Sequence, residues 1–391
     1  MTQTEGLNLP VVVLAPDHDG LCEVFGIPAV RRIVTLVRRM GCDDIHLCGR
    51  VDAFRPLLPL SAIPVKFHPA GDLPALEGIL REIAFPSQTG ILLVRADTVL
   101  DLPALERYAS VNSGRRLEPG AAGCADGICI ASAESLVPAA IRMWNSGTPG
   151  GASGCASDNG LPCTISGPGG AANAEDKLVE ALGTRTRESD GFLARHVSRR
   201  VSQPLSRILA RTPVTPNQVT VLNTLLGLSA AYLLARGGYW SQLAGSLLFV
   251  FCVIADGIDG EIARLKLMES SFGHMLDVVT DNIVHFAIFL GLGAGLSRSS
   301  GNPLYMDLFW LLLGGFLINI IVVYFRILKK SPEELRASPG AVRLMALLSN
   351  RDFAYLVLAL ALIGQLQLFM IGAAIGSYIF AAVLLFFSYE K

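Results

Sequence analysis

The stretch that decides the fold and the chemistry of this chain is residues 256–281, which read DGIDGEIARLKLMESSFGHMLDVVTD. Its four aspartates form two pairs, Asp256 with Asp259 and Asp277 with Asp281. Spacings of three and four residues place the members of each pair on one face of a helix. A polar break between the pairs allows the two helices to run antiparallel. The sequence therefore predicts four carboxylates gathered between two helices.

Carboxylates at a bilayer boundary are costly unless cations neutralise them. Two divalent cations would balance four negative charges, and oxygen ligands suit magnesium, manganese or calcium better than zinc. Two such ions side by side are a common device for displacement at phosphorus. The alternative is that the acids are helix-end charges that pair with Arg264 and Lys266.

Small residues accompany the acids and would let a helix or a ligand approach the backbone closely. They are Gly257, Gly260, Ala263 and Gly273. Arg264 follows Gly260 by one turn and is suited to bidentate binding of a phosphate. His274 and His285 are expected to be packing or interface residues.

Outward from this motif, the second half of the chain is predicted to lie in a membrane. Of 32 basic and 33 acidic residues, 22 in total fall in residues 214–391. A membrane span needs about 20 apolar residues. We expect an all-α membrane domain of six transmembrane helices, near residues 216–235, 240–267, 272–296, 304–328, 349–365 and 368–389. Basic residues in alternate loops predict an inner-membrane protein whose N-terminal domain, acidic motif and C-terminus face the cytoplasm.

Residues 1–190 are predicted to form a soluble α/β domain with a mostly parallel, Rossmann-like sheet, because apolar strand patterns alternate with helical patterns. The strands are expected at residues 10–16, 44–48, 63–67, 90–95 and 127–131. The helices are expected at residues 27–40, 73–84, 102–110, 132–144 and 174–184.

Residues 191–213 join the soluble domain to a membrane domain at residues 214–391. In this linker, residues 199–211 (RRVSQPLSRILAR) mix basic and apolar side chains. A basic amphipathic helix of this kind is expected to lie along an anionic membrane surface. An ordinary solvated linker helix is the alternative.

The composition excludes several classes of protein. Apolar residues make up 51% of the chain, charged residues 17%, and the formal net charge is −1. These values argue against a disordered chain and against binding of nucleic acid through bulk charge.

The complete pattern D-x2-D-G-x2-A-R-x8-G-x3-D-x3-D resembles the signature of the CDP-alcohol phosphotransferase (CDP-alcohol phosphatidyltransferase) family. Residues 215–220, TPNQVT, resemble the family's entry to the first span. The resemblance covers about residues 195–391. It implies a membrane transferase in which an acceptor hydroxyl attacks the phosphorus of a CDP-linked donor and CMP leaves. The donor is CDP-diacylglycerol or a CDP-alcohol.

The resemblance also implies the roles of individual residues. Asp256, Asp259 and Asp277 would ligate two Mg²⁺ or Mn²⁺ ions, and Asp281 would act as general base while also touching metal. Because a bound metal lowers the basicity of a carboxylate, we expect Asp281 to be the less tightly ligated aspartate. The CDP site would be lined by Asn217, Thr220, Gly260, Ala263, Arg264 and Gly273.

The resemblance leaves the acceptor alcohol unnamed and implies a homodimer. Arg326 and Arg351 are candidates for binding an acceptor phosphate, with topology-setting interfacial charge as the alternative. An ion-coupled transporter is a second class to consider, but the acids lie at one end of the spans. The resemblance therefore favours phospholipid or inositol-phosphodiester synthesis as the function.

The N-terminal half resembles cytidylyltransferases and related nucleotidyltransferases. Residues 25–49 and the segment ILLVRAD at residues 91–97 carry this resemblance, which places Asp97 where that family binds metal. The Gly-rich loop, its Arg and the following Lys are missing, so a triphosphate would lack its cradle. We expect a catalytically degenerate module or a nucleotide-binding scaffold; otherwise Asp97 is an ordinary strand-end acid. The arrangement of the two domains resembles that of fused inositol-phosphate cytidylyltransferase and di-inositol-phosphate phosphate synthase-like proteins.

Overall fold

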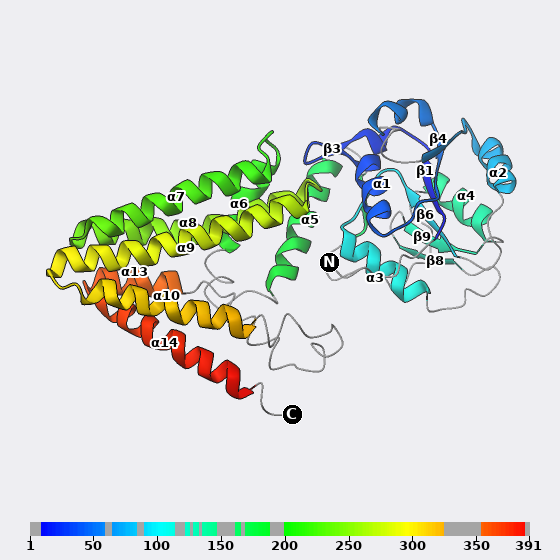
Figure 1. Cartoon of the computed structure of the whole chain (residues 1–391). Coiled ribbons are helices and arrows are strands. Elements are labelled where there is room, and N and C mark those ends of the chain that lie inside the picture. The colour runs from blue at the N-terminus through cyan, green and yellow to red at the C-terminus, as the bar shows by residue number, and fades with distance from the viewer. Residues whose placement is uncertain are drawn as a thin grey trace. The chain divides into compact units, whose positions relative to one another are not determined.

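The structure is a computed structural model, and it describes residues 9–58, 65–83, 90–113, 122–125, 128–132, 135–146, 161–165, 169–187, 199–323 and 353–387. The chain divides into two compact units. The first comprises residues 1–185 with 265–267, and the second comprises residues 186–264 with 268–391. Each unit is described by itself below (Figure 1).

The first unit is built on a six-stranded sheet with the order β5-β4-β1-β6-β9-β8. Its strands are β1 (Val11–Ala15), β4 (Ile45–Gly49), β5 (Val65–Pro69), β6 (Ile91–Arg95), β8 (Ala122–Ala125) and β9 (Ile128–Ala131). The first four strands in that order pair in parallel, whereas β9 is antiparallel to β6 and β8 is antiparallel to β9. The predicted α/β class is confirmed, and the sheet is mixed.

Helices cover both faces of this sheet. They are α1 (Ala29–Arg39), α2 (Leu73–Glu82), α3 (Leu102–Ser113) and α4 (Leu136–Ser146), and α5 (Gly170–Arg187) follows them in the chain. Alternate residues of β1 pack into two different cores, one shared with α1 and α3 and the other with α2 and α4. Burial on both faces explains why the β1 sequence, VVVLA, is apolar throughout. Two small antiparallel pairs complete the unit: β2 (Glu23–Val24) with β3 (Ile27–Pro28), and β7 (Thr98–Val99) with β10 (Cys163–Thr164).

The second unit is helical. Its described helices are α6 (Arg199–Ala210), α7 (Pro216–Arg236), α8 (Tyr239–Leu265), α9 (Ser271–Ser300), α10 (Leu304–Val323), α13 (Phe353–Leu362) and α14 (Leu366–Phe387). Five of these, α7, α8, α9, α10 and α14, are long and apolar enough to cross a membrane. The sixth expected span corresponds to α13, which is apolar but has 10 residues. Residues 324–352, just before α13, lie outside the described part of the chain.

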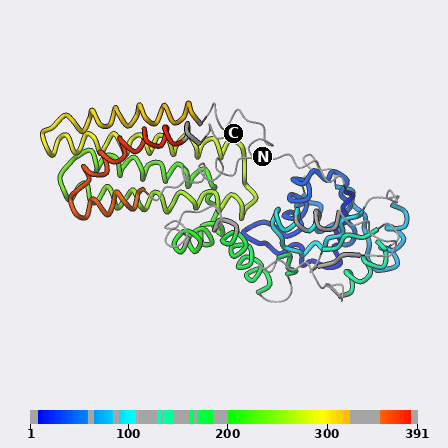
Figure 2. Tube along the Cα trace, turned by 90° about the horizontal axis from the view of Figure 1, so that it is seen from below, coloured from blue at the N-terminus to red at the C-terminus, as the bar shows by residue number. Residues whose placement is uncertain are grey.

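Helices α7 and α9 lie side by side (Figures 1 and 2) and meet backbone to backbone. A Cβ atom added at Gly291 would collide with the carbonyl of Ala231, and one at Gly295 with the carbonyl of Leu234. Small residues at these positions allow close approach of two helices where apolar surroundings supply little driving force for association. The separation of α7 and α9 is therefore fixed by main-chain contact.

Candidate active site

Three of the four predicted aspartates come together between α8 and α9. Carboxylate oxygens of Asp256, Asp277 and Asp281 all lie within 4.8 Å of one another. Helical spacing explains the arrangement, because Asp277 and Asp281 are one turn apart on α9. These oxygens form a group that is able to hold a divalent cation.

Asp259 is engaged differently. Among the described residues it lies outside the three-carboxylate group. Its carboxylate accepts hydrogen bonds from the Thr220 hydroxyl and, at 2.6 Å, from the Gly260 backbone N–H. The predicted set of four is thus brought to one end of the helices, with Asp259 tied to α7.

The start of α7 is held by a capping box. The Thr215 hydroxyl accepts from the N–H of Gln218, and the Gln218 side chain accepts from the N–H of Thr215 at 3.0 Å. Pro216 occupies the first turn, where its missing N–H costs no hydrogen bond. This cap fixes where α7 begins, and Asn217 and Thr220 follow directly.

A cavity of about 230 Å³ opens between the same helices. Its lining residues come from α7, from α8, from the α8–α9 connection and from α9: Pro216, Asn217, Thr220, Asp259, Gly260, Ala263, Arg264, Met268, Glu269, Ser270, Gly273, His274 and Asp277. All six residues predicted to bind the CDP group are in this wall. Asp277 belongs both to the wall and to the carboxylate group, so the two features adjoin.

Several wall residues were not singled out from the sequence. His274, expected to be a packing or interface residue, is exposed and lines the cavity. Its position directly after Gly273 in the motif is the signal that points to it. Ser270 caps α9 by accepting from the N–H of Gly273 at 3.0 Å. His285 does pack, against the rings of Phe249 and Phe353.

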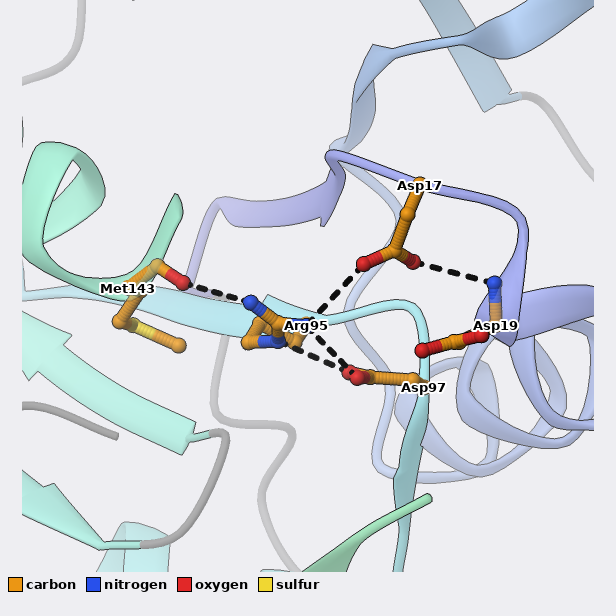
Figure 3. Close-up of polar contacts among 5 residues, drawn as sticks. All are labelled: Asp17, Asp19, Arg95, Asp97 and Met143. Carbon is orange, nitrogen blue, oxygen red and sulfur yellow. Dashed lines mark hydrogen bonds and ion pairs between the residues drawn. The ribbon is translucent and has the colours of Figure 1, made fainter. Parts of the chain in front are cut away.

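The first unit holds a second acidic group, drawn in Figure 3. Carboxylate oxygens of Asp17, Asp19 and Asp97 also lie within 4.8 Å of one another, at the carboxyl ends of β1 and β6. Here a guanidinium occupies the group: Arg95 donates to Asp97 at 3.0 and 2.7 Å and reaches Asp17 at 3.5 Å. Its third nitrogen donates to the Met143 carbonyl at 2.8 Å.

Electrostatics in this second group follow from burial and crowding. Burial raises the pKa of Asp19, and the neighbouring carboxylates of Asp17 and Asp97 raise it further. Burial opposes the charge of Arg95, but the hydrogen bond and charge of Asp97 dominate and raise the pKa of Arg95 overall. Arg95 is therefore a permanent cation in this position.

Arg326 and Arg351, the candidates for an acceptor phosphate, lie outside the described residues.

Comparison with known proteins bears on the helical unit. Residues 213–388 match the family model of CDP-alcohol phosphatidyltransferase. A bifunctional IPC transferase and DIPP synthase of Aquifex aeolicus (strain VF5) is 39% identical over 110 residues, which are 28% of this chain and 24% of that protein. A phosphatidylinositol phosphate synthase of Mycobacterium tuberculosis (strain ATCC 25618 / H37Rv) is 36% identical over 101 residues, 26% of this chain and 46% of that protein.

Both matches span less than half of the length of these curated relatives. Among solved structures, the crystal structure of the Mycobacterium tuberculosis phosphatidylinositol phosphate synthase with CDP-DAG bound is similar at 22% identity. The match covers 49% of this chain and 94% of that chain, with a TM-score of 0.36.

Proposed function

We propose that the CDP-alcohol phosphatidyltransferase domain at residues 213–388 transfers a substituted phosphate from a CDP-linked donor to an acceptor hydroxyl, with release of CMP. A bond forms between the acceptor oxygen and phosphorus, and the bond from phosphorus to the CMP oxygen breaks. The observation that carries the proposal is the three-aspartate group beside a cavity lined by all six residues expected to bind CDP.

The carboxylates fit a divalent cation. Asp256, Asp277 and Asp281 offer oxygens within 4.8 Å of one another, and oxygen-only donors suit Mg²⁺ or Mn²⁺. We place Asp256, Asp259, Asp277 and Asp281 as the ligands of two ions. When bound, the ions would neutralise charge on the phosphate oxygens.

The chain's own residues supply binding and proton transfer. Arg264 is suited to a donor phosphate because its guanidinium offers two parallel donors. Gly260 and Gly273 in the cavity wall let the donor approach the backbone. Asp281, one turn beyond Asp277, would take the proton from the acceptor hydroxyl as general base.

The substrates follow from chemistry and from the relatives. The relatives are named for phosphatidylinositol phosphate and DIPP synthesis, so we propose phospholipid or inositol-phosphodiester synthesis, with CDP-diacylglycerol and a soluble CDP-alcohol as alternative donors. Arg326 and Arg351 remain proposals for an acceptor phosphate. We also propose that the protein is a homodimer in the inner membrane, with the acidic motif toward the cytoplasm.

The test is CMP release by the purified full chain in detergent, with Mg²⁺ or Mn²⁺. CDP-diacylglycerol and CDP-inositol would each be offered with a panel of alcohols and alcohol phosphates. Metal-dependent CMP release with one pair is expected and would identify both substrates. The control is Asp307→Asn, which should release CMP at the rate of the unaltered chain, because Asp307 lies exposed at the start of α10 outside the cavity wall. A folded chain that neither binds CDP nor releases CMP would reject the proposal.

For the first unit we propose a non-catalytic role, as a nucleotide-binding scaffold. Support comes from Arg95, which already pairs with the Asp97 carboxylate that a metal would need. Nucleotide binding is tested by titrating the full chain with CTP; a loss of CTP affinity in Arg264→Gln, a substitution in the wall of the membrane cavity, would place that binding at the cavity instead.

A further inference from the structure

A buried carboxylate that the proposed reaction does not use lies inside the motif. Glu261 follows Gly260 on α8 and is 1% exposed. One of its oxygens accepts from the Ser202 hydroxyl at 3.0 Å, and the other accepts from the Ser206 hydroxyl at 2.5 Å. Both serines lie on α6, one turn apart, and both are also 1% exposed. Hydrogen bonds to a charged acceptor are the stronger kind.

These contacts supply much of what holds α6 in place. Its buried face is made of small residues, Ser202, Ser206 and Ala210, which have little apolar area to bury. Of its larger apolar residues, Val201, Leu205 and Ile208 are exposed on another face, and Leu209 is half-buried. Because apolar burial scales with area, the small buried face contributes little without the hydroxyl–carboxylate bonds.

The helix that Glu261 holds leads directly into the cavity wall. Helix α6 ends at Ala210, residues 211–215 follow, and α7 begins at Pro216. Pro216, Asn217 and Thr220 all line the cavity. Beyond the connection, the Thr220 hydroxyl donates to Asp259, two residues before Glu261 on α8. Two carboxylates of α8 therefore hold the α6–α7 segment, one on each side of the connection.

We propose that Glu261 is a positioning residue for the donor site: by binding Ser202 and Ser206 it sets the distance between the start of α7 and α8, and so the affinity for the CDP group. Glu261 itself lies outside the cavity wall. The proposal rests on the proposed function, because it assumes that the cavity is the CDP site.

The experiment compares the full chain in detergent with the double variant Ser202→Ala/Ser206→Ala. Three quantities are measured: hydrogen exchange of the α6 amides, the Kd for CDP, and KM and kcat for CMP release. We expect faster exchange in α6 and about a tenfold rise in Kd and KM, the size of effect that follows the loss of hydrogen bonds to a buried carboxylate, with kcat within about twofold. Ser229→Ala is the control, because the exposed Ser229 hydroxyl donates to the Leu225 carbonyl of its own helix, at 2.8 Å, and bonds to no other residue in the described part of the chain.

A second variant tests whether Glu261 and the two serines act on the Kd for CDP as one hydrogen-bonded network. Glu261→Gln keeps the shape and one acceptor oxygen, so we expect a rise in Kd of about threefold, less than in the serine variant. Combined with the serine substitutions it should add nothing, because residues of one hydrogen-bonded network act non-additively. Additive effects on Kd would overturn the proposal.

The outcomes distinguish this proposal from the proposed function. Faster α6 exchange with an unchanged Kd would show that α6 docking does not set the CDP site, and would overturn the positioning proposal alone. Unchanged exchange in both variants would overturn it as well. Failure of the unaltered chain to bind CDP would reject the proposed function, and the positioning proposal with it.

Discussion

The two acidic groups of this chain have the same make-up and different surroundings. Each brings together oxygens of three aspartates within 4.8 Å. In the sheet unit, Arg95 stands two residues before Asp97 and pairs with it at 2.7 Å, so the chain supplies its own cation. In the helical unit, the aspartates lie on two helices and adjoin a cavity whose wall includes Arg264. A cluster of carboxylates therefore indicates a metal site only where a cationic side chain of the protein does not already occupy it.

The largest expected difference between the two acidic groups is in the rate of CMP release after one carboxylate charge is removed from each. Asp281→Asn should lower the rate of CMP release by about 10³-fold, since general-base catalysis contributes on the order of 10²–10⁴. CDP affinity should be largely retained, which equilibrium titration would check. Asp17→Asn is the matched variant in the sheet unit and should leave the rate within about twofold. A large loss of rate in Asp17→Asn would show that the sheet unit takes part in catalysis.

Metal content gives the next largest contrast. Asp256→Asn should lower turnover about 100-fold and weaken Mn²⁺ binding, because a charged ligand is lost. Manganese bound per chain, counted by electron paramagnetic resonance, should fall in Asp256→Asn and stay unchanged in Asp17→Asn. Equal manganese content in all three proteins would contradict the assignment of the ions to the helical unit.

Removal of the Arg95 cation tests whether it takes the place of a metal ion in the sheet unit. Arg95→Met should destabilise the sheet unit by about 3–5 kcal/mol, because it leaves the buried Asp97 carboxylate unpaired. Thermal unfolding followed by circular dichroism measures this loss. Millimolar Mg²⁺ should raise the unfolding temperature of the sheet unit in the Arg95→Met chain, but not in the unaltered chain. Equal responses to Mg²⁺ would mean that Arg95 does not stand in for a metal.

The smallest expected effect concerns crowding among the carboxylates. The pKa of Asp19 is raised above its ordinary value of 3.8, by burial and then by Asp17 and Asp97. The folded state therefore binds the proton more tightly, and this contribution to the free energy of unfolding is present at low pH and lost as pH rises through the raised pKa. Asp19→Asn should gain stability relative to the unaltered chain as pH rises above 3.8. Unfolding curves at several pH values check the trend, and a constant difference would contradict it.

Local patterns in the sequence predict much of the fold. The continuous apolar run of β1 is a local pattern that predicts a buried strand of the sheet. The small residues around Asp256 are a second local pattern, which predicts close approach at the helical site. The antiparallel edge formed by β8 was not predicted, because its sequence, AGCA, carries little apolar signal. The sixth long span is also not confirmed, since the described part of α13 has 10 residues.

Contacts between distant residues explain what the sequence did not reveal at the site. Glu261 meets Ser206 across 55 positions, and no periodicity links them. Thr220 was singled out, but its bond to Asp259, across 39 positions, was not. Spacing along one helix predicts which residues share a face; it does not predict which other helix that face will meet.

The backbone contact between α7 and α9 sets the closest approach of two helices that line the cavity. Asn217 and Thr220 stand in its wall on α7, and Gly273 and Asp277 on α9. The two helices touch main chain to main chain at Gly291 and Gly295, so there they stand at their closest approach. For the proposed reaction, we expect a donor with long acyl chains to leave them outside the cavity of about 230 Å³, in the lipid, so that the head group decides which donor fits.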